Sequence, residues 1–476
     1  MNKVRTRFAP SPTGFMHIGN LRSALYEYLI AKHEGGTFIL RIEDTDQERY
    51  TEGAADAIFE TLRLTGLNFD EGPGLEGEYG PYIQSQRKAS YMPPALELVE
   101  KGHAYYCFCK KERLDTLADD KGIKKYDRHC HTLPPEEIQA LLDANTPFVI
   151  RQLIPEGKTT FTDQVFGDIT IDHKELEDQI LIKSDGMPTY NFANVVDDHN
   201  MAITHVARGS EYLTSTPKYK LLYEGLGWDV PIFVHLPLLV NATGQKISKR
   251  HGDASIKDLL EAGFLPDAII NYAALLGWSP PDNKEIFSLQ ELIKVFEAKN
   301  ISKSPSTFDM VKLTWVNGEH IKALPAKTFL EMALPHLKAH VKTPGTDYAA
   351  LARITQSRVN FVHECGELVD FIDSLRDYDI ELFTHKKMKT DPEVAKYGLA
   401  MAMCAFLPLD KWDHDSLSRA VTRGAEMTGM TKGQILWPIR VALSGKANTP
   451  CGAIEICELL GKAETLHRLA AGAEKL

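Results

Sequence analysis

The sequence predicts an α/β fold with a parallel sheet in the first half of the chain and an all-α domain at its end. Three observations carry this prediction. A strand, a helix and a second strand fit into residues 4–42, the same alternation returns with strands at 202–207 and 232–240 around a helix at 217–225, and no convincing strand occurs after about residue 324. Because parallel strands need crossover connections, usually helices, such alternation is typical of a parallel sheet.

The first strand–helix–strand unit has clear boundaries. Apolar and charged side chains alternate over residues 4–8, which is typical of a strand, and residues 9–14 then bring two prolines and a glycine, as a loop does. One apolar stripe over residues 21–29 predicts a helix that Gly35 and Gly36 end. The apolar residues 37–42 predict a buried second strand.

Changes of pattern further along divide the chain into domains. Proline and glycine clusters with short strands follow residue 73, the sheet pattern resumes after residue 183, and helical periodicity dominates after Ser255, which can cap a helix with Asp258. Periodic stretches at residues 326–337, 368–375, 433–443 and 453–469 predict the helices of the last domain. We therefore predict a sheet domain at 1–72 and 184–254, an insertion at 73–183, a helical region at 255–323 and an all-α domain at 324–476.

Composition limits the classes of protein. Of 476 residues, 43% are hydrophobic and 25% charged, which is typical of folded globular chains. No apolar run is long enough to cross a bilayer and the first residues lead into no apolar signal-peptide core, so we expect a cytoplasmic protein with no membrane partner. The net charge of −11 argues against nonspecific DNA binding, and any nucleic acid must meet a local basic face.

The loop at residues 10–20 has features of a nucleotide site. It joins the first strand to the first helix, where parallel sheets bind nucleotides, and the helix N-terminus offers N–H groups to phosphate. His17 can donate to a phosphate oxygen and Gly19 lets adenine approach the backbone. Taken alone, His17 is better interpreted as a capping or core residue.

A second loop changes this balance. Residues 246–250 (KISKR) follow the last predicted strand and place three cations where they can close over a triphosphate. The alternative is a solvated basic turn, which most such runs are. The two loops together favour an ATP site.

These loops also carry a resemblance to a known family. Residues 17–20 (HIGN) resemble the HIGH signature, and residues 246–250 the KMSKS signature, of class I aminoacyl-tRNA synthetases. Residues 7–14, 40–46, 189–199 and 205–211 are similar to those of bacterial glutamyl-tRNA synthetases, and the resemblance extends over nearly the whole chain. Asn20, Ile247 and Arg250 depart from the signature letters in ways that the glutamate-specific branch shares.

The resemblance implies a fold and a reaction. It implies a Rossmann-like catalytic domain with an inserted acceptor-binding domain, an all-α stem-contact region and an all-α anticodon-binding domain. It implies a monomer that uses ATP with Mg²⁺ to ligate L-glutamate to tRNA-Glu through glutamyl-adenylate. His17, Lys246 and Lys249 are the implied catalytic residues, and the implied ATP-binding residues are Pro10, Ser11, Thr13, Gly14, His17, Gly19, Asn20, Lys246, Ile247, Ser248, Lys249 and Arg250.

The resemblance also implies a glutamate pocket. Arg7, Tyr190 and Asn194 would bind the side-chain carboxylate, Arg208 the α-carboxylate, and Glu43 with Ser11 the ammonium. Each residue alone has a plain structural interpretation. Arg7 and Glu43 would then form an ordinary ion pair, and Tyr190 and Asn194 a hydrogen-bonded core pair.

A cysteine cluster is a candidate zinc site. Cys107, Cys109 and Cys130 have neighbours that can complete a tetrahedral set, and the family pattern implies Tyr126 as the fourth ligand, with His131 as the alternative. Free thiols in a metal-free insertion are the competing interpretation.

Two other functions stay open. One is an enzyme that charges tRNA-Gln as well as tRNA-Glu with glutamate. The other is a paralogue that binds tRNA without catalysis. The second is disfavoured because His17, Glu43, Arg208 and Lys249 are all present. A glutamine-specific enzyme is disfavoured by the helical C-terminal region.

Overall fold

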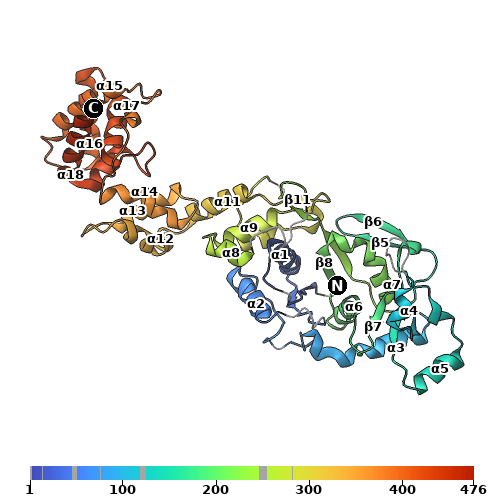
Figure 1. Ribbon diagram of the computed structural model, residues 1–476. Coiled ribbons are helices and arrows are strands. Elements are labelled where there is room, and N and C mark those ends of the chain that lie inside the picture. Colours follow the sequence, from blue (N-terminus) through green and yellow to red (C-terminus); the bar gives the residue numbers. More distant parts are fainter. Residues whose placement is uncertain are drawn as a thin grey trace. The chain divides into compact units, whose positions relative to one another are not determined.

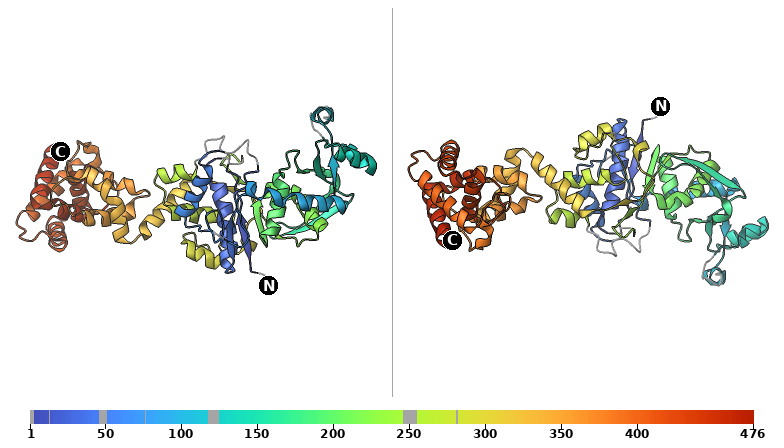
Figure 2. Two further views of the ribbon diagram at one scale, coloured as in Figure 1. Left: turned by 90° about the horizontal axis from the view of Figure 1, so that it is seen from below. Right: turned by 90° about the horizontal axis from the view of Figure 1, so that it is seen from above.

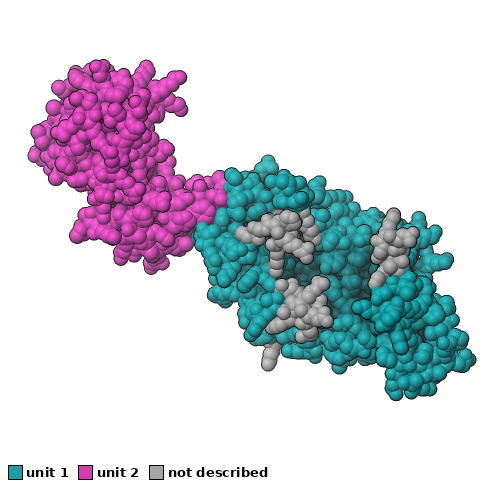
Figure 3. Space-filling model, in the orientation of Figure 1, with its two compact units in different colours: residues 1–313 teal, residues 314–476 magenta. Residues whose placement is uncertain are grey.

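The computed structural model describes residues 3–12, 14–45, 51–75, 77–117, 125–245, 255–280 and 282–476. The chain divides into two compact units, residues 1–313 and residues 314–476 (Figure 3). The first unit is α/β and the second is helical, which confirms the predicted fold class (Figure 1). None of the described helices combines the length and the apolar character needed to cross a membrane.

The first unit opens with the predicted strand–helix–strand element. β1 (Arg5–Phe8) and β2 (Thr37–Leu40) pair in parallel, joined by α1 (Ile18–His33). α1 is buried on most of its surface because β1 covers one side and α9 (Pro266–Leu275) another. The turn before β2 needs a glycine, since a Cβ on Gly36 would lie 2.3 Å from the carbonyl oxygen of Val4.

A four-stranded sheet forms another part of the first unit, in the order β6–β5–β9–β8. β8 (His205–Gly209) and β9 (Ile232–Leu236) are parallel, with α7 (Thr216–Leu226) between them, and α6 (Tyr190–Asn200) precedes β8. The prediction of strands at 202–207 and 232–240 needs two corrections. Ala202 has a left-handed backbone (φ 53°), so β8 starts at His205, and Pro237 lacks an N–H, so β9 ends before it.

The predicted insertion contributes to this sheet as well as forming one of its own. β5 (Lys158–Asp163) and β6 (Gly167–Asp172) form an antiparallel hairpin, and β5 pairs in parallel with β9. β3 (Ala104–Cys107), β4 (Val149–Gln152) and β7 (Ile180–Ile182) make a separate antiparallel sheet. This sheet shares a core with α6 and α7 through Ile150, Phe192 and Tyr223, while the boundaries of the insertion stay a prediction. Helices α2 (Ala54–Leu64), α3 (Met92–Glu100), α4 (Lys111–Asp115) and α5 (Pro135–Asp143) complete this part of the chain.

After the sheet, helices follow as predicted, with one exception. The hydroxyl of Ser255 accepts from the backbone of Asp258 at 3.2 Å, and this capping box starts α8 (Ile256–Glu261). α10 (Leu289–Val295) and α11 (Met310–Ala323) follow α9. The region is not purely helical, because β11 (Ser306–Thr307) pairs with β10 (Leu239–Val240).

The described residues of the second unit form helices and turns without a named strand, seen as the orange to red segment in both views of Figure 2. Its longer helices are α12 (Ala326–His340), α13 (Tyr348–Thr355), α15 (Pro392–Phe406), α16 (His414–Thr428), α17 (Lys432–Ser444) and α18 (Ala453–Lys475). The helix predicted over residues 368–375 is formed only in part: α14 (Cys365–Val369) passes into a 3-10 helix at Asp370–Ile372, and the carbonyls of Phe371 and Ile372 accept from the Arg468 guanidinium instead of a further helical turn.

Candidate active site

A cavity of about 290 Å³ lies where β1, α1, α6 and β8 meet. Its walls combine seven residues that the sequence singled out from four separate stretches: Arg7, His17, Gly19, Asn20, Tyr190, Asn194 and Arg208. Pro10, Ser11, Gly14 and Glu43 are not among the lining residues. Thr13, Lys246, Ile247, Ser248, Lys249 and Arg250 lie outside the described residues, so their predicted roles are not tested by the structure.

His17 both caps α1 and lines the cavity. Its Nδ1 accepts from the backbone N–H groups of Gly19 at 3.0 Å and Asn20 at 3.4 Å, so the neutral ring carries its proton on Nε2. A Cβ on Gly19 would lie 2.8 Å from Cε1 of His17, which explains why glycine follows the histidine so closely. The capping and the ligand-binding interpretations of His17 are therefore compatible.

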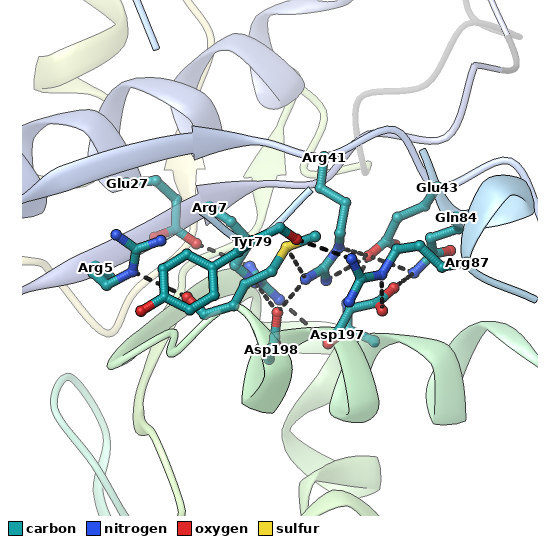
Figure 4. Close-up of polar contacts among 12 residues, drawn as sticks. Arg5, Arg7, Glu27, Arg41, Glu43, Tyr79, Gln84, Arg87, Asp197 and Asp198 are labelled. Carbon is teal, nitrogen blue, oxygen red and sulfur yellow. Dashed lines mark hydrogen bonds and ion pairs between the residues drawn. The ribbon is translucent and has the colours of Figure 1, made fainter. Parts of the chain in front are cut away.

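Arg7 is a buried cation whose remaining donors suit a carboxylate. Its Nε donates to Oδ1 of Asp198 at 2.9 Å, its Nη1 to Oε1 of Glu27 at 3.0 Å and its Nη2 to Oδ1 of Asn194 at 3.3 Å (Figure 4). Burial opposes the charge, but Asp198 and Glu27 outweigh it and raise the pKa of Arg7. Each Nη carries two N–H groups, so one on each stays available among the described contacts for a bidentate carboxylate.

Glu43 lies behind the cavity wall rather than in it. Its Oε1 accepts from Nη2 of Arg41 at 2.8 Å and from Nδ2 of Asn194 at 3.0 Å, while Arg41 also donates to Asp198 at 2.7 Å (Figure 4). This network turns the amide oxygen of Asn194 toward Arg7. The plain ion pair of Arg7 with Glu43 is not formed, because Arg41 takes Glu43 and Arg7 takes Asp198.

Arg208 is held at the end of β8 by aromatic rings and a neutral histidine. Its guanidinium lies 4.2 Å from the ring centre of Tyr219, its Nη2 donates to Oγ1 of Thr216 at 3.0 Å, and its Nε donates to Nε2 of His235 at 3.3 Å. Nδ1 of His235 lies 2.7 Å from Oδ2 of Asp163. Burial lowers the pKa of His235 despite this carboxylate, so Nε2 stays an acceptor for Arg208.

Three buried residues of the site carried no motif signal. Asp163 and His235 lie at or near the C-terminal ends of β5 and β9. Only the tertiary structure shows that they support Arg208. Glu27 lines the cavity and is 1% exposed. The helical period gave no signal for it, because Glu27 falls beside the apolar stripe of its helix rather than on it.

The cysteine cluster converges as a metal site would. The sulfur atoms of Cys107, Cys109 and Cys130 all lie within 4.8 Å of one another. The hydroxyl oxygen of Tyr126 lies 3.3 Å from the sulfur of Cys107 and 3.4 Å from that of Cys109. His131 is outside this group, and its ring instead lies 5.2 Å from that of Tyr105. Three thiols and a phenol oxygen therefore suit a tetrahedral zinc, with Tyr126 favoured as the fourth ligand.

The thiols of this cluster differ in how readily they lose a proton. Burial alone would raise the pKa of Cys107, but hydrogen bonds with Tyr126 and Arg151 bring it below its usual value, whereas burial raises the pKa of Cys109 to about 11. The Arg151 guanidinium also lies 4.2 Å from the ring centre of Tyr126. Since metal ligands must be deprotonated, a nearby cation favours the ligand form of the site.

The parallel sheet, the capped helix beside the cavity and the separate all-helical unit define a class I tRNA synthetase. Residues 3–315 match the family of tRNA synthetases class I (E and Q), catalytic domain, and residues 328–473 match an anticodon binding domain. The chain belongs to this family of E and Q synthetases.

Individual relatives agree over the full length. The chain is similar to the glutamate–tRNA ligase of Clostridium kluyveri, with 53% identity over 481 residues that cover 100% of this chain and 99% of the relative. It is 54% identical to that of Clostridium novyi over 478 residues, covering 100% and 98%. Among solved structures, a glutamate tRNA ligase from Elizabethkingia meningosepticum in complex with its amino acid has a TM-score of 0.87 at 36% identity and covers 100% of both chains.

Proposed function

We propose that the protein ligates L-glutamate to tRNA-Glu in two steps, through glutamyl-adenylate. The observation that carries the proposal is Arg7, a buried cation with two donors left for a carboxylate, in a cavity that His17 shares. The full-length similarity to glutamate–tRNA ligases supports the same conclusion.

The cavity suits an amino acid with a carboxylate at each end. Arg7, with Tyr190 and Asn194, binds the side-chain carboxylate and Arg208 the α-carboxylate. Glu43 and Ser11 are proposed for the ammonium, with Glu43 acting through Asn194 in the conformation described. A buried charge-assisted pairing is worth about 1.5 to 3 kcal/mol. Glutamine, whose amide cannot make this pairing, should therefore bind more weakly than glutamate by roughly one to two orders of magnitude.

Activation needs alignment rather than an enzyme nucleophile. An oxygen of the glutamate α-carboxylate attacks the α-phosphorus of ATP, the bond to the β-phosphate breaks, and pyrophosphate leaves. His17 donates to a phosphate oxygen, Gly19 and Asn20 border the nucleotide, and Lys246 and Lys249 offset the charge that develops on the phosphates. Mg²⁺ bound with ATP would add positive charge at the phosphates.

Transfer completes the reaction. The 2′-hydroxyl of the terminal adenosine attacks the carbonyl carbon of the adenylate, and AMP leaves. Residues 328–473, which match an anticodon binding domain, are proposed to read tRNA-Glu as unstacked bases. We propose that the protein acts as a cytoplasmic monomer.

We also propose a structural zinc held by Cys107, Cys109, Cys130 and Tyr126. Metal analysis of the purified protein is expected to find about one zinc per chain, because three sulfurs and the phenol oxygen already converge. Tyr126→Phe should keep the fold and release zinc to a chelator faster, whereas His131→Ala should not. A metal content well below one per chain would leave the cysteines as free thiols.

The function is tested by ATP–pyrophosphate exchange with glutamate or glutamine, each with and without tRNA-Glu or tRNA-Gln transcripts. Exchange that requires glutamate and tRNA-Glu supports the proposal. Exchange with tRNA-Gln as well would identify an enzyme that glutamylates both tRNAs. No exchange in a protein that still binds tRNA would overturn the proposal in favour of a noncatalytic tRNA-binding protein.

A further inference from the structure

Glu27 occupies a position that brings two carboxylates to one arginine. It lines the cavity from α1, and its Oε1 accepts from Nη1 of Arg7 at 3.0 Å and from the backbone N–H of Ala207 at 2.8 Å. We propose that Glu27 sets the charge state of the glutamate pocket, and that glutamate binds only to the form in which Glu27 is protonated. This inference rests on the proposed function, because it takes glutamate as the ligand of the cavity.

The charges around Arg7 do not balance. Arg7 and Arg41 face Glu27, Glu43 and Asp198 in one connected cluster, and each of these five side chains is at most 4% exposed (Figure 4). With every group ionised, the cluster carries one negative charge in excess. A bound side-chain carboxylate would add a second negative charge, and carboxylates that share a buried site cannot all ionise.

Glu27 is better placed than its neighbours to take the proton. Asp198 accepts from both arginines, and although burial opposes it, Arg7 and Arg41 keep the pKa of Asp198 below its usual value. Burial raises the pKa of Glu43, and its Oε2 has no partner among the described residues, but Glu43 accepts two hydrogen bonds from Arg41 and does not line the cavity, so a ligand at Arg7 meets Glu27 first. Burial raises the pKa of Glu27 to about 8, with Arg7 and Ala207 acting against that rise.

The hydrogen bonds of Glu27 fit its protonated form. Both donors, Nη1 of Arg7 and the N–H of Ala207, meet Oε1, while Oε2 is buried and has no partner among the described residues. Oε1 can serve as the carbonyl oxygen of a neutral acid and keep both bonds, leaving the proton on Oε2. An ionised Oε2 would instead be a buried charge without a donor, which is costly.

The groups that face Glu27 come from each element packed around it. β1 supplies Arg7, α6 supplies Asp198 and β8 supplies the N–H of Ala207. The cavity wall beyond carries Arg208, Glu211 and, on α1 itself, Arg22, whose Nη groups donate to the carbonyls of Leu276 and Pro237. Arg7 is the cation in direct contact, and Asp198 already shares it. A second anion at Arg7 therefore shares a cation that two carboxylates already contact, and this raises the proton affinity of Glu27.

Protonated Glu27 would also sharpen the choice of substrate. A neutral Glu27 no longer competes with the ligand for the charge of Arg7. A bound carboxylate then makes a charge-assisted pairing with Arg7 that the amide of glutamine cannot make. Arg7 and Glu27 together would thus favour the acid over the amide.

Calorimetry of glutamate binding to the full-length protein tests the inference. Glutamate is titrated from about pH 7 to about pH 9 in pairs of buffers that differ in ionisation enthalpy, which yields the protons taken up per glutamate bound. For the wild-type protein we expect uptake to rise toward one proton, and the affinity to fall about tenfold per pH unit above about pH 8. Glu27→Gln, which is neutral at every pH, should lose this uptake, and it corrects for the titration of the glutamate ammonium.

Glu71→Gln is the matched control. Glu71 forms an ion pair with Arg5, which lies on the same strand as Arg7, and Oε1 of Glu71 is 2.8 Å from Nη1 of Arg5. Glu71 does not line the cavity. This variant should retain the uptake of the wild type. Saturable glutamate binding by the wild type without proton uptake, or unchanged uptake in Glu27→Gln, would overturn the inference and leave the proposed function intact. A wild-type protein that binds no glutamate would overturn both.

Discussion

The two arginines proposed for the ends of the substrate are held in opposite ways. Arg7 lies between the carboxylates of Asp198 and Glu27 inside a buried network of charges. Arg208 lies against the ring of Tyr219 and donates to the neutral imidazole of His235. One arginine is held by anions and the other by neutral groups.

The difference predicts which arginine also stabilises the fold. Removing a cation from among buried carboxylates leaves charges without a partner, which costs stability as well as binding. Removing a cation from among rings and a neutral histidine leaves no such charge. Substitution of Arg7 should therefore lower both stability and substrate binding, whereas substitution of Arg208 should lower mainly substrate binding.

Arg7→Ala is expected to have the largest effect. It leaves Glu27 without a cation and Asp198 with Arg41 alone, so the free energy of unfolding should fall by about 3 to 5 kcal/mol. Glutamate-dependent exchange should fall by about 10- to 100-fold or more, while the KM for ATP changes little. Urea unfolding and exchange kinetics measure the two effects. A variant with wild-type glutamate kinetics would show that Arg7 does not bind the substrate.

Arg208→Ala should separate function from stability. The loss of the α-carboxylate partner should lower kcat/KM for glutamate by about 10- to 100-fold. The free energy of unfolding should fall by only about 1 kcal/mol, because the lost contacts are a cation–π pair and hydrogen bonds to neutral groups. If this variant were destabilised as strongly as Arg7→Ala, the contrast between the two arginines would fail.

The same contrast marks what the sequence could predict. Arg7 and Arg208 stand in stretches that resemble a family, and both line the cavity as expected. Their supports are long-range: Asp163 and His235 are 72 residues apart and sit on strands that no local pattern pairs. Glu27 falls beside the apolar stripe of its helix, and only the packing of α1 against β1 and β8 shows that it is buried and which polar groups it meets.

The errors in the predicted ends of strands and helices have a related cause. Helical and strand periods located most elements to within a few residues, as for α1 and α17. The ends of β8 and β9 depended on one left-handed residue and one proline. The helix predicted to residue 375 stops at Ile372, where Arg468, about 100 residues away, bonds the carbonyls that a further turn would use. Local patterns carry no information on such distant partners.

Asp163→Asn should weaken the support of Arg208 without touching the substrate. An asparagine can turn its NH₂ toward Nδ1 of His235 and favour the tautomer with a proton on Nε2, which then faces Nε of Arg208 as a second donor. We expect the KM for glutamate to rise about tenfold, equal to about 1.4 kcal/mol, with the KM for ATP unchanged. Asp168→Asn, on the exposed side of the same hairpin, is the control and should leave both constants unchanged.

Thr216→Val should have the smallest effect because it removes only hydrogen bonds between neutral groups and one neutral acceptor of Arg208. Oγ1 of Thr216 is fully buried, accepts from Nη2 of Arg208 at 3.0 Å and donates to the carbonyl of Tyr212 at 2.9 Å, and valine fills the same space without either bond. A cost of about 1 kcal/mol corresponds to a rise of about fivefold in the KM for glutamate. The exposed Thr160→Val is the control in steady-state exchange kinetics. A larger effect than that of Asp163→Asn would mean that Thr216, and not the Asp163–His235 pair, orients Arg208.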